Sequence, residues 1–349
     1  MTPTDAADGP SQTPPFAGLT PEVVLDALDS VGLRGDGRLL QLNSYENRVF
    51  QVFLEDGRVV VAKFYRPGRW SDEQILEEHT FTAELANEEI PVVPPWVLDR
   101  VEYSRLTARF CGQPPTLAEV DTPAGPYRVA VAQRRSGRAP MLEEPATLEW
   151  LGRFIARMHV VGARSAFRFR RTLSVAEFGW ASRDWLCKHG DIPPDVAPAW
   201  QLAVDEALGA AEEAFSRAGK VNTIRLHGDC HVGNVLWTEA GPHFVDLDDA
   251  LTGPAVQDLW MLLPSEPTEM RRQLKPLLTG YEAFMDFNDA ELALIEPLRT
   301  LRIVHHSAWL AKRWNDPAFP VAFPWFASPS YWRQQTQELR EQIEAMRGR

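Results

Sequence analysis

The residues best suited to chemistry are Asp229, Asn234 and Asp246, in the stretches LHGDCHVGNVL (residues 226–236) and FVDLDD (residues 244–249). Asn234 follows Asp229 by five positions, and Asp246 comes after two short apolar runs that predict a β-hairpin. In phosphoryl transfer of the kinase type, one Asp orients the acceptor hydroxyl, and an Asn and a second Asp hold Mg²⁺ on the phosphates. We therefore predict an ATP- and Mg²⁺-dependent phosphotransferase with Asp229 and Asp246 as catalytic residues and Asn234 and Asp246 as metal ligands.

The same stretch contains an alternating trio, His227, Asp229 and His231, that has the residue types of a zinc or iron site. Asn234 and Asp246 offer the hard oxygen ligands that Mg²⁺ prefers. We therefore favour magnesium and expect His227 to be a structural support. A transition-metal site is the alternative.

A lysine that pairs with the ATP phosphates is expected on a strand, and Lys63 lies in such a run, VVVAKFY (residues 59–65). Its carboxylate partner is expected on the helix that follows. Glu77, Glu78 and Glu84 compete for this role, and we favour Glu78 because of its position relative to the apolar residues of that helix.

The loop that covers the phosphates is expected between the first two strands, in NSYENR (residues 43–48). It lacks the glycine pattern G-x-G-x-x-G. Backbone N–H groups and the Ser44 hydroxyl are nevertheless able to contact phosphate, but without the glycines the loop alone does not assign Ser44 to nucleotide binding.

Local patterns predict the elements that carry these residues. Thr20 caps a helix that starts at Pro21 and stops at Gly32. An Asp-Gly turn joins two runs of β-forming residues, which indicates an antiparallel hairpin. The predicted strands are 39–42, 49–54, 59–65, 103–110 and 127–131, with a helix at 71–86 capped by Ser71.

Long helices dominate the rest of the chain. Thr147 is expected to cap a helix that runs to about His159. Further helices are predicted at 196–219, 266–278, 290–314 and 329–346, and a hairpin at 235–238 and 243–245. The fold class is therefore α+β and bilobal: residues 1–18 form a flexible N-terminal tail, 19–135 a small β-rich N-lobe that covers ATP, and 136–349 a large helical C-lobe.

Bulk properties exclude other classes of protein. The 349 residues carry a formal net charge of -12, which disfavours nucleic acid and anionic membranes as partners. The three cysteines Cys111, Cys187 and Cys230 are odd in number and widely spaced, so they predict no disulfide framework. Neither a signal peptide nor a membrane-spanning stretch is expected, and a cytoplasmic location fits best.

The motifs LNSYENRV, ILEEH, LHGDCHVGN, FVDLDD and GPAVQDLWMLL resemble the stress response kinase A family, also called SrkA, RdoA or YihE. This family lies in the aminoglycoside phosphotransferase and choline kinase branch of the protein kinase-like fold. The resemblance implies a cytoplasmic, monomeric Ser/Thr protein kinase that autophosphorylates and promotes survival under stress. It also implies that Ser44 belongs to the ATP-binding loop and that Asp258 braces the catalytic loop from a helix.

Two rival functions stay open. One is a small-molecule hydroxyl kinase of the same fold, in which acidic and aromatic side chains hold a cationic substrate. The other is a nucleotide-binding protein without transfer activity, although the presence of Lys63 and Asp229 argues against it. The side chains that the first rival would use are Asp248, Asp249, Trp309, Trp314, Trp325 and Trp332.

Overall fold

The computed structural model describes residues 14–101 and 104–348, and the chain divides into two compact units. The sheet unit comprises Met1–Trp70, Val97–Val131 and Arg313–Phe323. The helical unit comprises Ser71–Trp96, Ala132–Lys312 and Pro324–Arg349. Each unit is therefore assembled from segments that are far apart in sequence. The sequence predicts two continuous lobes, residues 19–135 and 136–349, and this division of the chain into domains stays a prediction.

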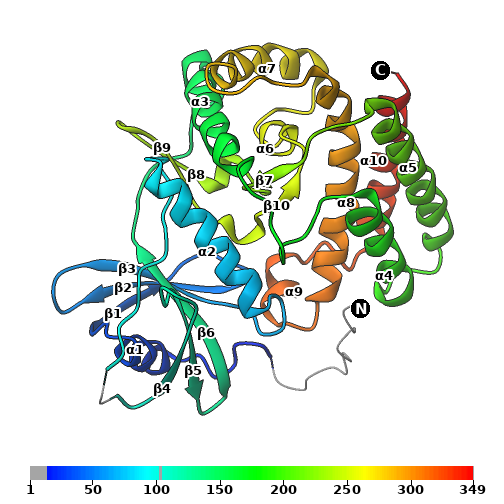
Figure 1. The fold of residues 1–349 in the computed structure, drawn as a ribbon. Helices are drawn as coiled ribbons and strands as arrows, with labels where there is room; N and C mark the ends of the chain where they lie inside the picture. The colour runs from blue at the N-terminus through cyan, green and yellow to red at the C-terminus, as the bar shows by residue number, and fades with distance from the viewer. Residues whose placement is uncertain (1–13, 102–103, 349) are drawn as a thin grey trace. The chain divides into compact units, whose positions relative to one another are not determined.

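The sheet unit is built on a six-stranded sheet in the order β1-β2-β3-β6-β5-β4 (Figure 1). β1 to β3 and β4 to β6 each form an antiparallel run. Alternate side chains of β3 are fully buried, as expected for a sheet with one face in a core. The elements of this unit are α1 (Pro21–Ser30), β1 (Gly35–Gln41), β2 (Arg48–Leu54), β3 (Val59–Phe64), β4 (Thr107–Cys111), β5 (Leu117–Thr122), β6 (Gly125–Gln133, which ends in the helical unit) and α9 (Ala318–Ala322).

The helical unit contains long amphipathic helices and two small β-ladders. The ladders are antiparallel: β7 pairs with β10, and β8 pairs with β9. Its helices are α2 (Asp72–Asn87), α3 (Pro145–Gly162), α4 (Ala181–His189), α5 (Ala197–Ala218), α6 (Val256–Trp260), α7 (Pro267–Tyr281), α8 (Ile295–Lys312) and α10 (Pro329–Arg347). Its strands are β7 (Ile224–Leu226), β8 (Val235–Thr238), β9 (Gly241–Phe244) and β10 (Leu251–Gly253).

Most predicted elements are confirmed, and their caps explain why. The Thr20 hydroxyl accepts a hydrogen bond from the Val23 N–H, and α1 ends before Gly32, which has a φ of 84°. Ser71 and Gln74 form a reciprocal capping box at the start of α2. The α+β class follows directly from these elements.

Three expectations differ from the structure. Thr147 does not cap α3: the helix starts at Pro145, and Thr147 is buried inside it. The strand β5 was not predicted, because its polar residues obscure the apolar alternation. Residues 1–13 of the predicted tail lie outside the described residues, but Phe16, counted with that tail, is buried and stacks on Tyr127 with ring centroids 6.1 Å apart.

Within the described part of the chain, no helix is both long and apolar enough to cross a membrane.

Candidate active site

Two β-ladders bring the predicted site residues of the helical unit together. β7 leads into the loop that contains Asp229, and its partner β10 follows the segment that contains Asp246. The β8–β9 hairpin pairs Val235 with Phe244, so Asn234 and Val245 lie across from each other. The Val245 N–H donates to the Asn234 carbonyl at 3.0 Å. The segments that contain Asp229, Asn234 and Asp246 thus connect the strands at one end of both ladders.

Asp258 on α6 braces the loop of residues 227–234, the proposed catalytic loop, as the family resemblance implied. Its carboxylate is fully buried and accepts hydrogen bonds from the backbone N–H groups of His227 and Gly228, each at 2.8 Å. A buried carboxylate that binds two backbone N–H groups is a strong anchor, because the charge strengthens both bonds and leaving either side unpaired is costly. The prediction for Asp258 is confirmed.

Gly228 has the backbone conformation that the loop requires. Its φ is 84°, in the region that favours glycine. A Cβ at this position would lie 2.3 Å from the carbonyl oxygen of Asp249. The turn therefore allows the loop to approach the segment after Asp246 more closely than any larger residue permits.

His227 is a structural residue rather than a metal ligand. Its ring is fully buried, and its Nε2 lies 3.0 Å from the Val245 carbonyl oxygen. Because a carbonyl only accepts, Nε2 carries the hydrogen, and Nδ1 is the acceptor for the Asp229 N–H at 3.4 Å. His227 thus ties the loop to the residue before Asp246, as predicted for a structural support.

Asn234 and Asp229 are in direct contact. The Asn234 Nδ2 donates to the backbone carbonyl of Asp229 at 2.9 Å and lies 3.4 Å from its Oδ2. The amide nitrogen is therefore committed to Asp229, and the amide oxygen is the atom that Asn234 would offer to a metal.

Both carboxylate oxygens of Asp229 have partners. Oδ1 accepts from the Arg302 Nη1 of α8 at 2.7 Å, and Oδ2 lies 3.4 Å from the His231 Nε2. Partial burial favours the neutral carboxyl, but the hydrogen bond from His231 and the charge of Arg302 outweigh it and hold the pKa of Asp229 well below its ordinary value. Asp229 is thus an ionised carboxylate, the form that accepts a proton. Arg302 was not anticipated, since one arginine in a helical stretch carries no signal in sequence.

Asp246 has an unusual backbone for a residue other than glycine, with φ 60° and ψ 59°. Asp is one of the residue types that tolerate this left-handed region, and such residues gather at functional sites. The segment that follows is held by Arg170, a buried residue. Its guanidinium donates to the carbonyls of Asp248 and, at 2.8 Å, of Ala250.

Glu77 on α2 supports the segment after Asp246 indirectly, through residues 168–170. The Glu77 carboxylate accepts hydrogen bonds of 2.6, 2.9 and 2.9 Å from the backbone N–H groups of residues 168, 169 and 170. Arg170 in turn binds the segment after Asp246. Glu77 and Glu84, which pairs with Arg225 at 2.7 Å, therefore have structural partners within the helical unit. Glu78 is buried and accepts from the Thr82 hydroxyl at 2.7 Å, and its pairing with Lys63 stays a prediction.

The donor set of this site fits Mg²⁺ better than a transition metal. Asn234 and Asp246 supply an amide and a carboxylate oxygen, and Mg²⁺ is usually held by one or two such ligands together with phosphates and water. No group of three or more His, Cys, Asp or Glu side chains suited to a metal occurs among the residues that the structure describes. The Nε2 atoms of His227 and His231 face Val245 and Asp229 instead.

In the sheet unit, Lys63 and Ser44 lie where the sequence placed them. Lys63 is on β3, with its Nζ 5.8 Å from the centroid of the Tyr65 ring. Ser44 is half-buried in the loop between β1 and β2. Their contact with a nucleotide stays a prediction.

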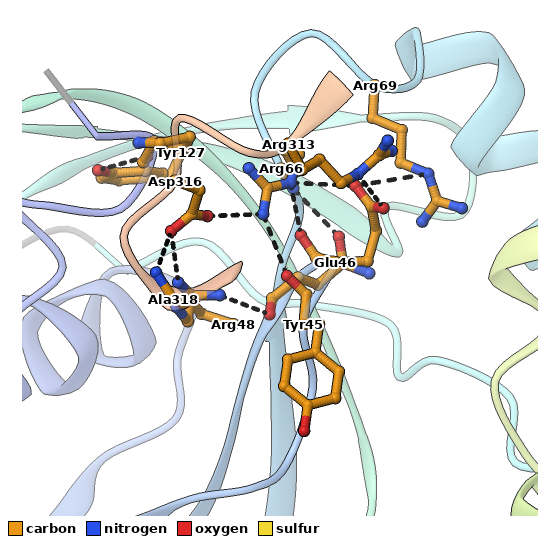
Figure 2. A network of polar contacts seen from close by, with 11 residues as sticks. Tyr45, Glu46, Arg48, Arg66, Arg69, Tyr127, Arg313, Asp316 and Ala318 are labelled. Atoms are coloured by element: carbon orange, nitrogen blue, oxygen red, sulfur yellow. Dashed lines mark hydrogen bonds and ion pairs between the residues drawn. The ribbon is translucent and has the colours of Figure 1, made fainter. Parts of the chain in front are cut away.

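The loop of residues 43–48 is anchored by a buried ionic network that the sequence did not predict (Figure 2). The Arg66 guanidinium donates to the backbone carbonyls of Glu46 and Tyr45 at 2.9 and 3.1 Å and to the Asp316 carboxylate at 2.8 Å. The Glu46 carboxylate lies 2.6 Å from the Arg313 Nε. Segment 313–323, remote in sequence, thus holds this loop.

Three of the four tryptophans named for a cationic substrate have different surroundings. Trp332 is buried and packs edge-to-face on Trp200, so it is a core residue. Trp325 is 44% exposed and its ring lies against that of Tyr331, and Trp309 stacks on His306. These contacts assign no common substrate surface.

Comparison with known proteins agrees with this geometry. Residues 38–295 match the model of the Phosphotransferase enzyme family (APH). Stress response kinase A of Escherichia coli (strain K12) is 42% identical over 331 residues, which cover 95% of this chain and 94% of that protein. The same identity and coverage hold for a protein of Salmonella typhimurium (strain LT2) named serine/threonine protein kinase RdoA.

Two solved structures have a similar fold and are kinases by name. A microcompartment-associated aminopropanol kinase has a TM-score of 0.70 at 16% identity and covers 93% of this chain and 98% of its own. The amicoumacin kinase hAmiN, in complex with AMP-PNP, Ca²⁺ and Ami, has a TM-score of 0.67 at 19% identity, and the match covers 93% of each chain. At these identities the likeness shows the kinase-like fold alone.

Proposed function

Because the chain belongs to the phosphotransferase enzyme family, and within it to the stress response kinase A family, we propose that it is an ATP- and Mg²⁺-dependent Ser/Thr protein kinase. In this proposal it phosphorylates itself and protein substrates, acts as a cytoplasmic monomer and contributes to survival under stress. The family membership supports the kinase activity, and the names of the relatives support the protein acceptor.

The observation that carries the proposal is the braced pair Asp229 and Asn234. Asp258 holds the backbone of the loop, and Asn234 holds Asp229 by a hydrogen bond of 2.9 Å to its carbonyl. Phosphoryl transfer demands little covalent help from the protein, and its main requirement is a fixed arrangement of acceptor and charge. A loop with this much internal support meets that requirement.

The residues have distinct roles in the proposed reaction. The acceptor hydroxyl oxygen forms a bond to the γ-phosphorus, the bond from that phosphorus to the β–γ bridging oxygen breaks, and ADP leaves. Asp229 orients the hydroxyl and receives its proton. Lys63 pairs with the phosphates, and Ser44 contacts them from the loop. Asn234 and Asp246 would hold Mg²⁺, which would offset the phosphate charge.

The test is transfer of label from γ-³²P-ATP in the presence of Mg²⁺, to the protein itself and to dephosphorylated casein. We expect phosphoserine or phosphothreonine in the wild type and its loss in Asp229→Asn. If the wild type binds nucleotide but labels neither itself nor any acceptor, the chain is a nucleotide-binding protein without transfer activity and the proposal fails.

The second candidate is a small-molecule hydroxyl kinase, because the solved structures of this fold include an aminopropanol kinase and an amicoumacin kinase. A panel of amino alcohols, choline and aminoglycosides, tested with the same labelled ATP, separates the two. Transfer to one of these compounds with a much higher kcat/KM than to casein would replace the protein-kinase assignment.

A further inference from the structure

A contact between Arg302 and Asp229 adds a residue to the site that neither the spacing of the motif nor the family resemblance assigned. Arg302 lies on α8, 73 positions after Asp229, and its Nη1 donates to the Asp229 Oδ1 at 2.7 Å. The Arg302 side chain is 46% exposed and that of Asp229 is 25% exposed, so the pair lies at the surface of the helical unit. An exposed ion pair of this kind contributes little to the stability of the fold. Its effect is instead on the orientation of the Asp229 carboxylate.

The two oxygens of the Asp229 carboxylate are held from two different elements. Arg302 holds Oδ1 from α8, whereas His231 and Asn234 approach Oδ2 from the catalytic loop itself, each at 3.4 Å. With contacts on both oxygens, rotation of the carboxylate about its Cβ–Cγ bond is restricted. A carboxylate has about four lone-pair sites, so a free position remains for the hydroxyl of an acceptor.

We propose that Arg302 is a positioning residue for phosphoryl transfer, which fixes the orientation of the Asp229 carboxylate toward the acceptor hydroxyl. The inference rests on the proposed function, because it gives Asp229 the role of receiving the acceptor proton. Arg302 acts through Asp229 and not through the nucleotide. Its removal therefore lowers kcat and leaves the affinity for Mg-ATP unchanged.

The experiment compares the full-length wild type with Arg302→Gln, Arg302→Lys and a matched control, Arg333→Gln. Arg333 also forms an Arg–Asp pair, with Asp195 at 2.8 Å, but on α10 and outside the catalytic loop. Casein phosphorylation gives kcat and the KM for ATP, and calorimetric titration gives the affinity for Mg-ATP. Circular dichroism and thermal unfolding verify that each variant is folded.

Arg302→Gln should lower kcat about 10- to 100-fold, the size of effect expected when a reacting group is misplaced by about 1 Å. The KM for ATP and the affinity for Mg-ATP should stay within about twofold of wild type. Arg302→Lys should restore part of kcat, because a single contact to Oδ1 needs one donor and not a bidentate fork. Arg333→Gln should match the wild type.

Other results overturn the inference. A kcat of Arg302→Gln equal to that of wild type shows that the contact does not position Asp229, and a higher kcat shows that Arg302 restrains the enzyme. A raised KM for ATP at constant kcat places its effect on the nucleotide. A wild type that transfers no phosphate removes the proposed function and this inference with it, whereas an active wild type with an unaffected Arg302→Gln removes the inference alone.

Discussion

The Nε2 of His159 on α3 lies 3.1 Å from the Oδ2 of Asp258, and both side chains are fully buried. The His159 Nδ1 in turn lies 2.8 Å from the Tyr281 hydroxyl of α7. The carboxylate that anchors the catalytic loop is thus itself fixed by two helices. The conformation of the catalytic loop therefore depends on buried contacts in the core of the helical unit.

Replacement of Asp258 should therefore affect both stability and activity. Asp258→Ala leaves two backbone N–H groups and His159 without their acceptor, and we expect a loss of about 3–5 kcal/mol in the free energy of unfolding, as for other broken buried pairs. Urea denaturation measures it. Asp195→Asn, at an exposed ion pair, is the control and should change stability by no more than about 0.5 kcal/mol. Similar values for both variants would contradict the anchoring role.

Gly228→Ala tests the tight turn of the catalytic loop against a matched glycine. Gly57 has the same φ of 84°, but a Cβ there meets nothing within 4 Å. Gly57→Ala should cost about 1–2 kcal/mol, the penalty of a left-handed residue alone. Gly228→Ala adds a clash with the Asp249 carbonyl and should lower stability further and reduce phosphate transfer. Unfolding curves measure the stability of both variants. Equal losses of stability in Gly228→Ala and Gly57→Ala would contradict the predicted clash at Gly228.

The division of labour between Asp229 and Asp246 is separable by kinetics. Asp229→Asn should reduce transfer by orders of magnitude and leave nucleotide affinity nearly intact, because in the proposed mechanism this residue acts on the acceptor hydroxyl and not on the nucleotide. Asp246→Ala should weaken Mg-ATP binding as well, because it removes a proposed metal ligand. Isothermal titration with Mg-ATP and single-turnover transfer give the two quantities. Equal losses of affinity in the two variants would show that the roles are not divided in this way.

The loop of residues 43–48 should depend on Asp316 for its geometry. Asp316→Asn removes the charge that holds Arg66 at 2.8 Å, and we expect the KM for ATP to rise about tenfold, equivalent to about 1.4 kcal/mol of binding free energy, with a smaller change in kcat. Asp36→Asn, at the exposed Asp36–Arg38 pair of β1, is the control and should behave as the wild type. An unchanged KM for ATP in Asp316→Asn would show that the ionic network does not affect nucleotide binding.

Acid should weaken the same network through Glu46. Burial favours the neutral form of Glu46, but Arg69, Arg313 and Arg66 outweigh it and hold its pKa below the ordinary value. A lowered folded-state pKa means that the stabilisation is complete above the unfolded pKa, about 4.5. It is lost as the pH falls through the folded pKa.

Glu46→Gln provides the reference for this effect. The wild type should be more stable than Glu46→Gln by an amount that is constant above about pH 5 and shrinks below about pH 4. Denaturant titrations at several pH values measure the difference. A difference that does not vary with pH would show that Glu46 is not held as an ion by its arginine partners.

Sequence alone determined the features that depend on neighbours along the chain. The caps of α1 and α2, the strands β1 to β3 and the β8–β9 hairpin follow from local residue types, because capping groups and turn residues act over three or four positions. The spacing of Asp229, Asn234 and Asp246 likewise predicted one site, since a short loop and a hairpin connect them.

Only the tertiary structure decided which distant groups complete that site. Arg302 reaches Asp229 from α8, and Asp316 reaches Arg66 across 250 positions of sequence. Arg170 holds the segment after Asp246, a contact that no local pattern encodes. Ion pairs between distant segments depend on how helices and loops pack, and an arginine in a helix has the same local signature whether it faces water or a carboxylate of the candidate site. The sequence therefore predicted which groups react, and packing determined which side chains hold them in place.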